Sequence, residues 1–469
     1  MNGLRQGTAE VARPSSAREA SIGSAVRLAA EIAVRFSSIV ATLWLTRSLG
    51  VTLFGEFILC LSVGLMIAEL CDLGLNAIVV PQIVRDSASL RTLLWLKAAM
   101  TAGVGGIGVV LVPVTASLTS VAPFLLALAT LHFLGASWIE FMGTSLRALG
   151  RRGEEAALLL LFRLALVALV IGAPFGLTLR GSALSYAAAV VPALVLGLVL
   201  LGKHLPDRGA AVMDIRAVLR QAAPMGVNGY LSLLSTRVEL FVLQGPFGSH
   251  VVGLFGGALR IVESLLTLPS AIAGGALPAI SREVVTGSRG AAQRTFGLVV
   301  WLAAPCAVGL AVRAPEVLAV LGPGFVDGAP ALKILSVGLF LCFSNVALFH
   351  ALIGAGETAV IPRLTGLRVG VALALALMLI PSLGLVGAAI SFTGAEAFLL
   401  AMLTRAARLH VHIDVARPVV WSLGACVPMA VALSLWNPAL PISIALAALL
   451  FCMTGAAILR RGTEMAGLA

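Results

Sequence analysis

The sequence predicts an all-α polytopic membrane protein with about fourteen transmembrane helices, and three observations lead to this fold class. Hydrophobic residues make up 59% of the chain and charged residues only 11%, whereas about a quarter of an ordinary soluble domain is charged. Apolar stretches of about 18 residues or more recur along almost the whole chain, as membrane-spanning helices require. These stretches do not alternate with period two, as the strands of a membrane barrel would.

The predicted spans alternate with short loops that indicate the topology. In chain order they cover roughly residues 22–48, 53–80, 92–113, 121–146, 156–177, 182–202, 222–245, 251–280, 295–312, 331–355, 363–381, 385–404, 417–435 and 440–458. Lys and Arg gather in every second loop, and the opposite side carries only Arg47, Arg180, Arg313 and Lys333. Because Lys and Arg favour cytoplasmic loops, both termini are expected in the cytoplasm. The net charge of +11 therefore reflects topology, and nucleic acid is not an expected partner.

An internal repeat divides the chain into two lobes. Gly50 and Gly55 follow the first span, and Gly248 and Gly253 follow the seventh at an offset of 198 residues. Further landmarks at the ends of spans recur at offsets of 197 to 206 residues. Each unit has an even number of spans, so the two units form a parallel repeat, as in alternating-access transporters. The expected divisions are a cytoplasmic tail 1–20, an N-lobe 21–203, a cytoplasmic linker 204–220, a C-lobe 221–406, and a region 407–469 with two further spans and a tail.

Charged side chains inside the first span lie on one helical face. Arg27, Glu31 and Arg35 follow one another at intervals of four residues. A charge at mid-bilayer costs on the order of 3 kcal/mol unless it is paired or hydrated. This face must therefore contact protein or water, and one arginine remains in excess after Glu31 pairs with the other.

The seventh and eighth spans carry charges in the equivalent part of the second repeat. Arg237 and Glu239 lie on nearly opposite stripes of the seventh span, and the sequence leaves open which stripe faces a cavity. Arg260 and Glu263 share a face of the eighth span with several glycines. These four residues, with those of the first span, form the predicted substrate-binding cavity.

A second candidate site lies on one face of the second span, where Glu69, Asp72 and Asn76 are close in sequence. This group is a candidate for coupling transport to a proton or sodium gradient. The alternative is that its acids pair with an arginine of the opposite lobe.

An arginine-rich cavity suits an anionic headgroup, because guanidinium groups bind phosphate oxygens in a bidentate manner. A site for a simple cation would instead be dominated by acids. The six cysteines show no metal-binding spacing, so neither a metal nor a cofactor is expected. No loop is long enough for a catalytic domain, which argues against an enzyme.

Several short motifs resemble Wzx-type polysaccharide flippases over roughly residues 22–405. They are LTRSLG at 45–50, DLGL at 72–75, VGLF at 252–255, ALRI at 258–261 and GLVGAA at 384–389. Their order and spacing are more specific than any one of them alone. The same superfamily includes multidrug exporters and lipid II flippases.

The resemblance implies two six-helix lobes in a V around a central cavity. It implies a flippase of the bacterial inner membrane that moves a polyprenyl-diphosphate-linked oligosaccharide from the cytoplasmic to the periplasmic leaflet, for surface polysaccharide such as exopolysaccharide or lipopolysaccharide. Arg260 and one arginine of the first span fit places where related flippases engage the diphosphate. Glu69 and Asp72 stand in the span where lipid II flippases usually carry an arginine, which argues against that subfamily.

The expected partners are the lipid-linked oligosaccharide, membrane lipids, and a polysaccharide polymerase with its export machinery. One alternative is a cation-coupled multidrug exporter, which would want a cavity dominated by acids. A second alternative is a membrane-embedded polymerase or ligase, which would need a large periplasmic loop that this chain lacks.

Overall fold

The computed structural model describes residues 17–86, 89–110, 112–119, 121–205, 214–286, 290–357, 360–411, 413–435, 442, 451 and 453. The side chains of residues 17–36, 38, 109, 118–119, 284–285 and 410 lie outside this description. The described part is helical throughout, with short connections and without strands, as the sequence predicts.

The helices follow the predicted spans closely. In chain order they are α1 (Ala17–Asp72), α2 (Leu75–Arg85), α3 (Ser89–Met100), the π-helical η1 (Thr101–Gly105), α4 (Gly106–Val110), α5 (Val112–Thr119), α6 (Pro123–Ala148), α7 (Arg152–Gly172), α8 (Leu179–Gly202), α9 (Ile215–Leu234), α10 (Val238–Leu265), α11 (Thr267–Thr286), α12 (Ala291–Val312), α13 (Ala314–Ala319), the 3₁₀ helix η2 (Pro323–Gly328), α14 (Ala329–Gly354), α15 (Ile361–His410) and α16 (Ala416–Leu435).

Three of these helices bend sharply at a glycine. The kinks lie at Gly50 in α1, Gly248 in α10 and Gly384 in α15, where φ is 71°, 70° and 54°. Positive φ is accessible to glycine at little cost, which explains the residue type at these turns. Each kink falls between two predicted spans. The long helices α1 and α15 therefore each cross the membrane twice, whereas α10 joins the end of the span that α9 begins to the start of the span that α11 completes. The first two kinks have nearly the same ψ, 179° and −177°, so the backbone confirms the repeat.

Nine stretches of the described chain are long and apolar enough to cross a membrane. The stretches Ile39–Arg85, Ile215–Glu283 and Ile361–Leu409 have 47, 69 and 49 residues, whereas one crossing needs about 20. They therefore each supply two predicted spans, and the third predicted span is the interrupted series α3, η1 and α4. Most of the last predicted span, 440–458, lies outside the described residues.

The two lobes meet where α1 and α10 bend. A Cβ built on Gly55 would lie 1.9 Å from the main-chain oxygen of Ser249, and one on Gly253 would lie 2.0 Å from that of Val51. Only glycine permits backbones to approach so closely. Between these two contacts, Thr52 Oγ1 and His250 Nδ1 lie 3.2 Å apart.

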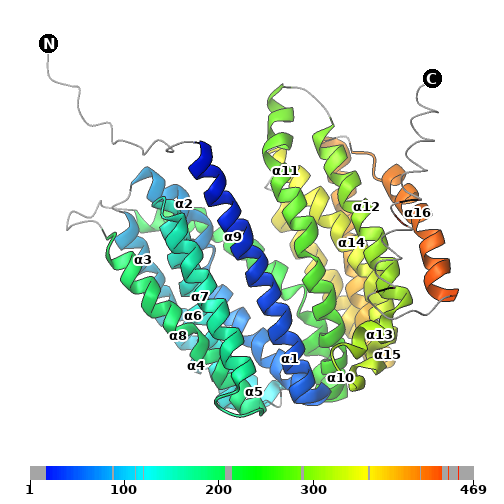
Figure 1. Cartoon of the computed structure of the whole chain (residues 1–469), viewed down its shortest axis with the longest axis horizontal. Coiled ribbons are helices and arrows are strands. Elements are labelled where there is room, and N and C mark those ends of the chain that lie inside the picture. Colours follow the sequence, from blue (N-terminus) through cyan, green and yellow to red (C-terminus); the bar gives the residue numbers. More distant parts are fainter. Residues whose placement is uncertain are drawn as a thin grey trace.

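At the other end of the molecule the lobes separate on one side only. Figure 1 shows that α1 and α11 diverge toward the start of α1 and the end of α11, which gives the two lobes a V shape. On the other side, α9 packs against the break between α1 and α2: a Cβ on Gly226 would lie 2.2 Å from the carbonyl carbon of Leu73. The lobes therefore stay in backbone contact along α9 and part between α1 and α11.

Candidate functional site

A cavity of about 860 Å³ lies between the lobes. The N-lobe contributes α1, α2, α6 and α7 to its wall, and the C-lobe contributes chiefly α10. Its volume is in the upper part of the usual range for small-molecule sites. Nine charged residues line it: Glu69, Asp72, Glu140, Arg147, Arg152, Glu155, Arg163, Arg260 and Glu263.

One wall of the cavity is acidic and is organised around a buried lysine. Lys97 of α3 is 0% exposed, and its Nζ lies 2.6 Å from Asp72 Oδ1 and 2.7 Å from Ser137 Oγ. Asp72 Oδ2 also accepts a hydrogen bond from the main-chain nitrogen of Asn76 at 3.3 Å. The buried ammonium neutralises Asp72, since an uncompensated charge there would be costly.

Two further carboxylates belong to this acidic wall. Glu69 and Glu140 line the cavity close enough to Asp72 and Lys97 to interact with their charges. Neither forms an ion pair with another residue whose side chain the structure describes. One alternative from the sequence was that acids of the second span pair with an arginine of the opposite lobe. For Asp72 the structure shows a different partner, a lysine of its own lobe.

The facing part of the cavity is basic. Arg260 of α10 is 41% exposed at its side chain, and its NH1 contacts Glu263 Oε2 at 3.3 Å. Arg237 approaches the other oxygen of the same carboxylate at 2.7 Å. One carboxylate is thus shared by two guanidinium groups, and Arg163 of α7 completes this basic wall from the N-lobe.

Arg147 and Glu155 lie at the end of the cavity where α6 and α7 meet. Arg147 NH2 lies 2.7 Å from Glu155 Oε1, which links the end of α6 to the first turn of α7. Glu155 is buried, so this ion pair holds α6 and α7 together beside the cavity. An acid in the first turn also suits the positive end of the helix.

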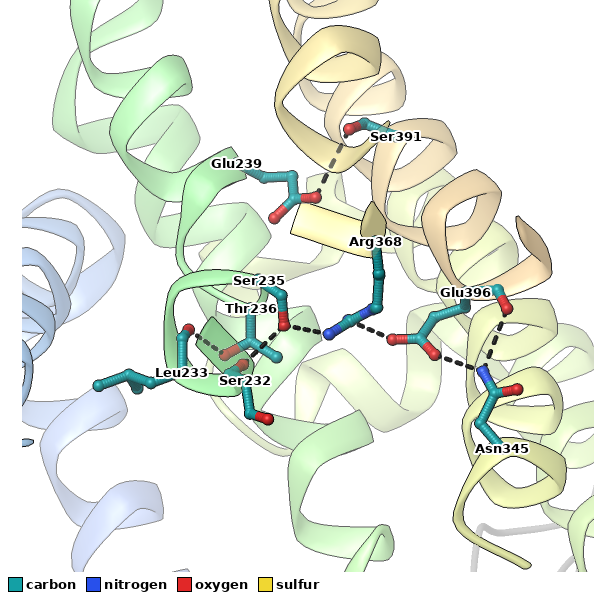
Figure 2. Close-up of polar contacts among 9 residues, drawn as sticks. All are labelled: Ser232, Leu233, Ser235, Thr236, Glu239, Asn345, Arg368, Ser391 and Glu396. Atoms are coloured by element: carbon teal, nitrogen blue, oxygen red, sulfur yellow. Dashed lines mark hydrogen bonds and ion pairs between the residues drawn. The ribbon is translucent and has the colours of Figure 1, made fainter. Parts of the chain in front are cut away.

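A second polar cluster lies inside the C-lobe, outside the residues that line the cavity (Figure 2). Arg368 of α15 forms an ion pair with Glu396 of the same helix and a hydrogen bond to Ser235. Asn345 Nδ2 donates to Glu396 Oε2 at 2.7 Å. Glu239 lies beside this cluster, 0% exposed, and accepts a hydrogen bond from Ser391 Oγ at 3.5 Å.

The structure places the predicted site residues in three groups. Arg260 and Glu263, with Glu69, Asp72 and Asn76, line the cavity. Arg237 pairs with Glu263 and Glu239 contacts Ser391 inside the C-lobe, and neither of them lines the cavity. The side chains of Arg27, Glu31 and Arg35 lie outside the described residues.

Sequence reasoning did not include Arg163, Glu140 or Lys97 in the site. Arg163 and Lys97 are single charges on their spans, whereas Glu140 lies on one face of the fourth span with His132 and Thr144. The available signal was that charges inside membrane helices face protein or water. Only helix packing brings Glu140 and Arg163 to the cavity and Lys97 to Asp72 at its wall.

Comparisons with known proteins bear on what this cavity belongs to. A family model described as "Polysaccharide biosynthesis protein" matches residues 23–283, more than half of the chain. The chain belongs to this polysaccharide biosynthesis protein family. The match confirms the resemblance to Wzx-type proteins that the motifs suggested. No functionally curated protein matches the chain.

Solved structures share the fold of this family member. The lipid II flippase MurJ in an inward closed conformation superposes with a TM-score of 0.74 at 10% identity, covering 94% of this chain and 99% of MurJ. An inward-facing multidrug resistance MATE family transporter superposes with a TM-score of 0.66 at 16% identity, covering 81% of this chain and 94% of the transporter. A MOP superfamily transporter from Pyrococcus furiosus superposes with a TM-score of 0.52 at 18% identity, covering 83% of this chain and 93% of that transporter.

These likenesses establish the architecture. The polysaccharide biosynthesis family member has the V-shaped, two-lobed fold of the MOP superfamily and is a multi-pass membrane protein. The solved structures that share its fold are transporters and flippases.

Proposed function

We propose that the protein is a flippase that moves a polyprenyl-diphosphate-linked oligosaccharide across a bacterial inner membrane by alternating access, for surface polysaccharide biosynthesis. The observation that carries the proposal is the cavity between two lobes of a transporter fold, into which Arg260 projects. Family membership in polysaccharide biosynthesis supports the oligosaccharide as the substrate class.

Arg260 has the chemistry to receive a diphosphate. It holds Glu263 through a single long contact of 3.3 Å, and much of its side chain remains exposed to the cavity. Glu263 is held more tightly by Arg237 at 2.7 Å, so an arriving anion can displace the weaker contact without leaving Glu263 unpaired. Guanidinium binds phosphate oxygens in a bidentate, charge-assisted manner. Arg27 and Arg35 are further proposed contacts from the first span.

The shape of the molecule accommodates the rest of such a substrate. In this proposal the polyprenyl tail remains in lipid beside the lobes while the headgroup enters the cavity. Hydroxyl, amide and carboxylate groups of the N-lobe wall can hydrogen-bond sugar hydroxyls. Rocking that separates the lobes at the glycine contacts of Gly55 and Gly253 would then expose the cavity on the other side.

The sidedness follows from the distribution of Lys and Arg. Because the ends of the helices remote from Gly50 and Gly248 carry most of these residues, that end faces the cytoplasm in our proposal. The cavity is then loaded from the cytoplasmic leaflet, and a polymerase with its export machinery would take the product outside.

Complementation of a strain that lacks its own flippase tests the proposal. The intact chain is expected to restore surface glycan, and Arg260→Gln at matched membrane abundance is expected to lose it. Arg180→Gln removes a charge of the same kind from an exposed position outside the cavity and should behave as the intact chain does. If Arg260→Gln restores glycan fully, the diphosphate role of Arg260 is refuted. If the intact chain restores none and instead lowers drug accumulation, the exporter alternative replaces the proposal.

A further inference from the structure

The basic wall of the cavity is built by both lobes. Arg163 comes from α7 of the N-lobe and Arg260 from α10 of the C-lobe, and both line the same cavity. Each guanidinium therefore adds positive charge to the cavity from a different lobe, and the two like charges disfavour each other.

The described acids compensate these two arginines incompletely. Glu263 divides its two oxygens between Arg237 and Arg260. Arg163 forms no ion pair or hydrogen bond within the part of the chain that the structure describes, and its guanidinium carbon lies 5.1 Å from the centre of the Phe162 ring. Glu140 lines the same cavity but does not pair with Arg163. Because uncompensated charges inside a membrane protein are costly, an anion bound between Arg163 and Arg260 would stabilise both.

A diphosphate provides two anionic centres joined by one bridging oxygen. We infer that Arg163 and Arg260 bind the two phosphoryl groups from opposite lobes, which makes Arg163 the residue that selects a diphosphate lipid over a monophosphate lipid. This inference rests on the proposed function. A lipid with one phosphate offers a single centre and leaves one guanidinium without a partner, whereas the diphosphate satisfies both.

The arrangement also links recognition to the movement of the lobes. An anion held by one guanidinium from each lobe replaces repulsion between the lobes with attraction to a shared ligand. A ligand shifts a conformational equilibrium only through such differential contacts. A monophosphate lipid is held from one lobe alone, so its contacts differ less between the two conformations and shift the equilibrium less.

Direct binding to the purified full-length protein in lipid nanodiscs tests the inference, with undecaprenyl diphosphate and undecaprenyl monophosphate as probes. Arg163→Gln is expected to weaken diphosphate binding by about tenfold or more, as loss of a charge-assisted contact does. Its affinity for the monophosphate should stay within about threefold of that of the intact protein, since that lipid needs one guanidinium. Arg163→Lys keeps the charge without the planar fork, so its diphosphate affinity should lie between those of the intact protein and Arg163→Gln.

Arg180→Gln is the matched control. It removes an arginine from an exposed position outside the cavity, where solvent screens the charge, so both affinities should change by no more than about twofold. Equal losses for both lipids in Arg163→Gln would show a general electrostatic effect and overturn the inference. Unchanged diphosphate binding in Arg163→Gln and Arg163→Lys would overturn it as well.

The same measurements separate this inference from the proposed function. If Arg260→Gln abolishes diphosphate binding while the Arg163 variants bind normally, the flippase proposal stands and the role of Arg163 is refuted. If the intact protein binds neither lipid, the proposed function itself is refuted. Thermal unfolding shows whether Arg163→Gln folds. If it does not, the ratio of diphosphate to monophosphate affinity is measured for Arg163→Lys and compared with that of the intact protein.

Discussion

Replacing Glu396 by glutamine should strongly destabilise the C-lobe. Glu396 and Arg368 are 4% and 6% exposed, and they form an ion pair inside the lobe. Glutamine keeps the shape of the side chain and can still contact Asn345, but it removes the charge that balances Arg368. Leaving one member of a buried pair uncompensated costs about 3–5 kcal/mol. That loss is large against a total stability of about 5–15 kcal/mol for a typical domain.

Denaturant unfolding of the purified variants in mixed micelles measures this loss. The double variant Arg368→Met with Glu396→Met removes both charges and should recover most of the stability, because a buried pair replaced by apolar groups is often neutral. Glu239→Gln is the matched control in the same cluster. Glu239 forms no ion pair within the described residues and one weak contact with Ser391, so its loss should cost about 1 kcal/mol or less.

Two results would refute the reasoning. The first is an equal loss in Glu239→Gln and Glu396→Gln, which would mean that Arg368 is balanced by both acids. The second is a double variant as unstable as Glu396→Gln alone, which would mean that shape and hydrogen bonding, and not charge compensation, hold the cluster together.

Three further changes test other contacts. Gly55→Ala places a Cβ 1.9 Å from a main-chain oxygen of the other lobe, so it should lower stability by about 1–3 kcal/mol in the same unfolding assay. Lys97→Met leaves Asp72 buried without its cation and should cost about 3–5 kcal/mol, seen as a lower unfolding temperature. Thr52→Cys with His250→Cys joins the lobes where their side chains are 3.2 Å apart. A thiol cross-link there should abolish glycan export reversibly, because rocking must separate this contact.

Each of these changes has a control within the chain. Gly245→Ala adds the same methyl group to α10 where nothing lies within 4 Å, so it should be neutral or slightly stabilising. Adding Asp72→Asn to Lys97→Met should restore part of the lost stability. Either single cysteine variant should export glycan with or without oxidant. Undiminished export by the cross-linked protein would refute separation of the lobes at this contact.

The kinked helices show how far local sequence specifies this fold. The offset of 198 residues between Gly50 and Gly248 predicted equivalent turns, and both glycines adopt nearly identical backbone angles. The sequence could specify these turns because positive φ is a local property that only glycine adopts freely. The apolar spans were equally legible, since bilayer thickness fixes their length.

The sequence predicted that charges inside the membrane are costly, but it did not predict which residues pair with one another. Lys97 stands near the start of the third predicted span, and only the structure shows that it is fully buried against Asp72. Glu239 was a predicted cavity residue, yet it does not line the cavity and contacts Ser391 inside the C-lobe. A pair of residues far apart in sequence depends on how helices rotate and pack, which helical periodicity alone does not specify.

The sequence by itself determined the class of the protein, the number and order of its spans, the repeat and the chemistry of its intramembrane charges. These follow from composition, bilayer thickness and the conformational freedom of glycine, all of which act within one or two helices. Only the tertiary structure decided that Arg163 and Arg260 line the same cavity and that Asp72 is neutralised within its own lobe. Such arrangements arise from contacts between different helices, and their energies are set by the burial that packing alone creates.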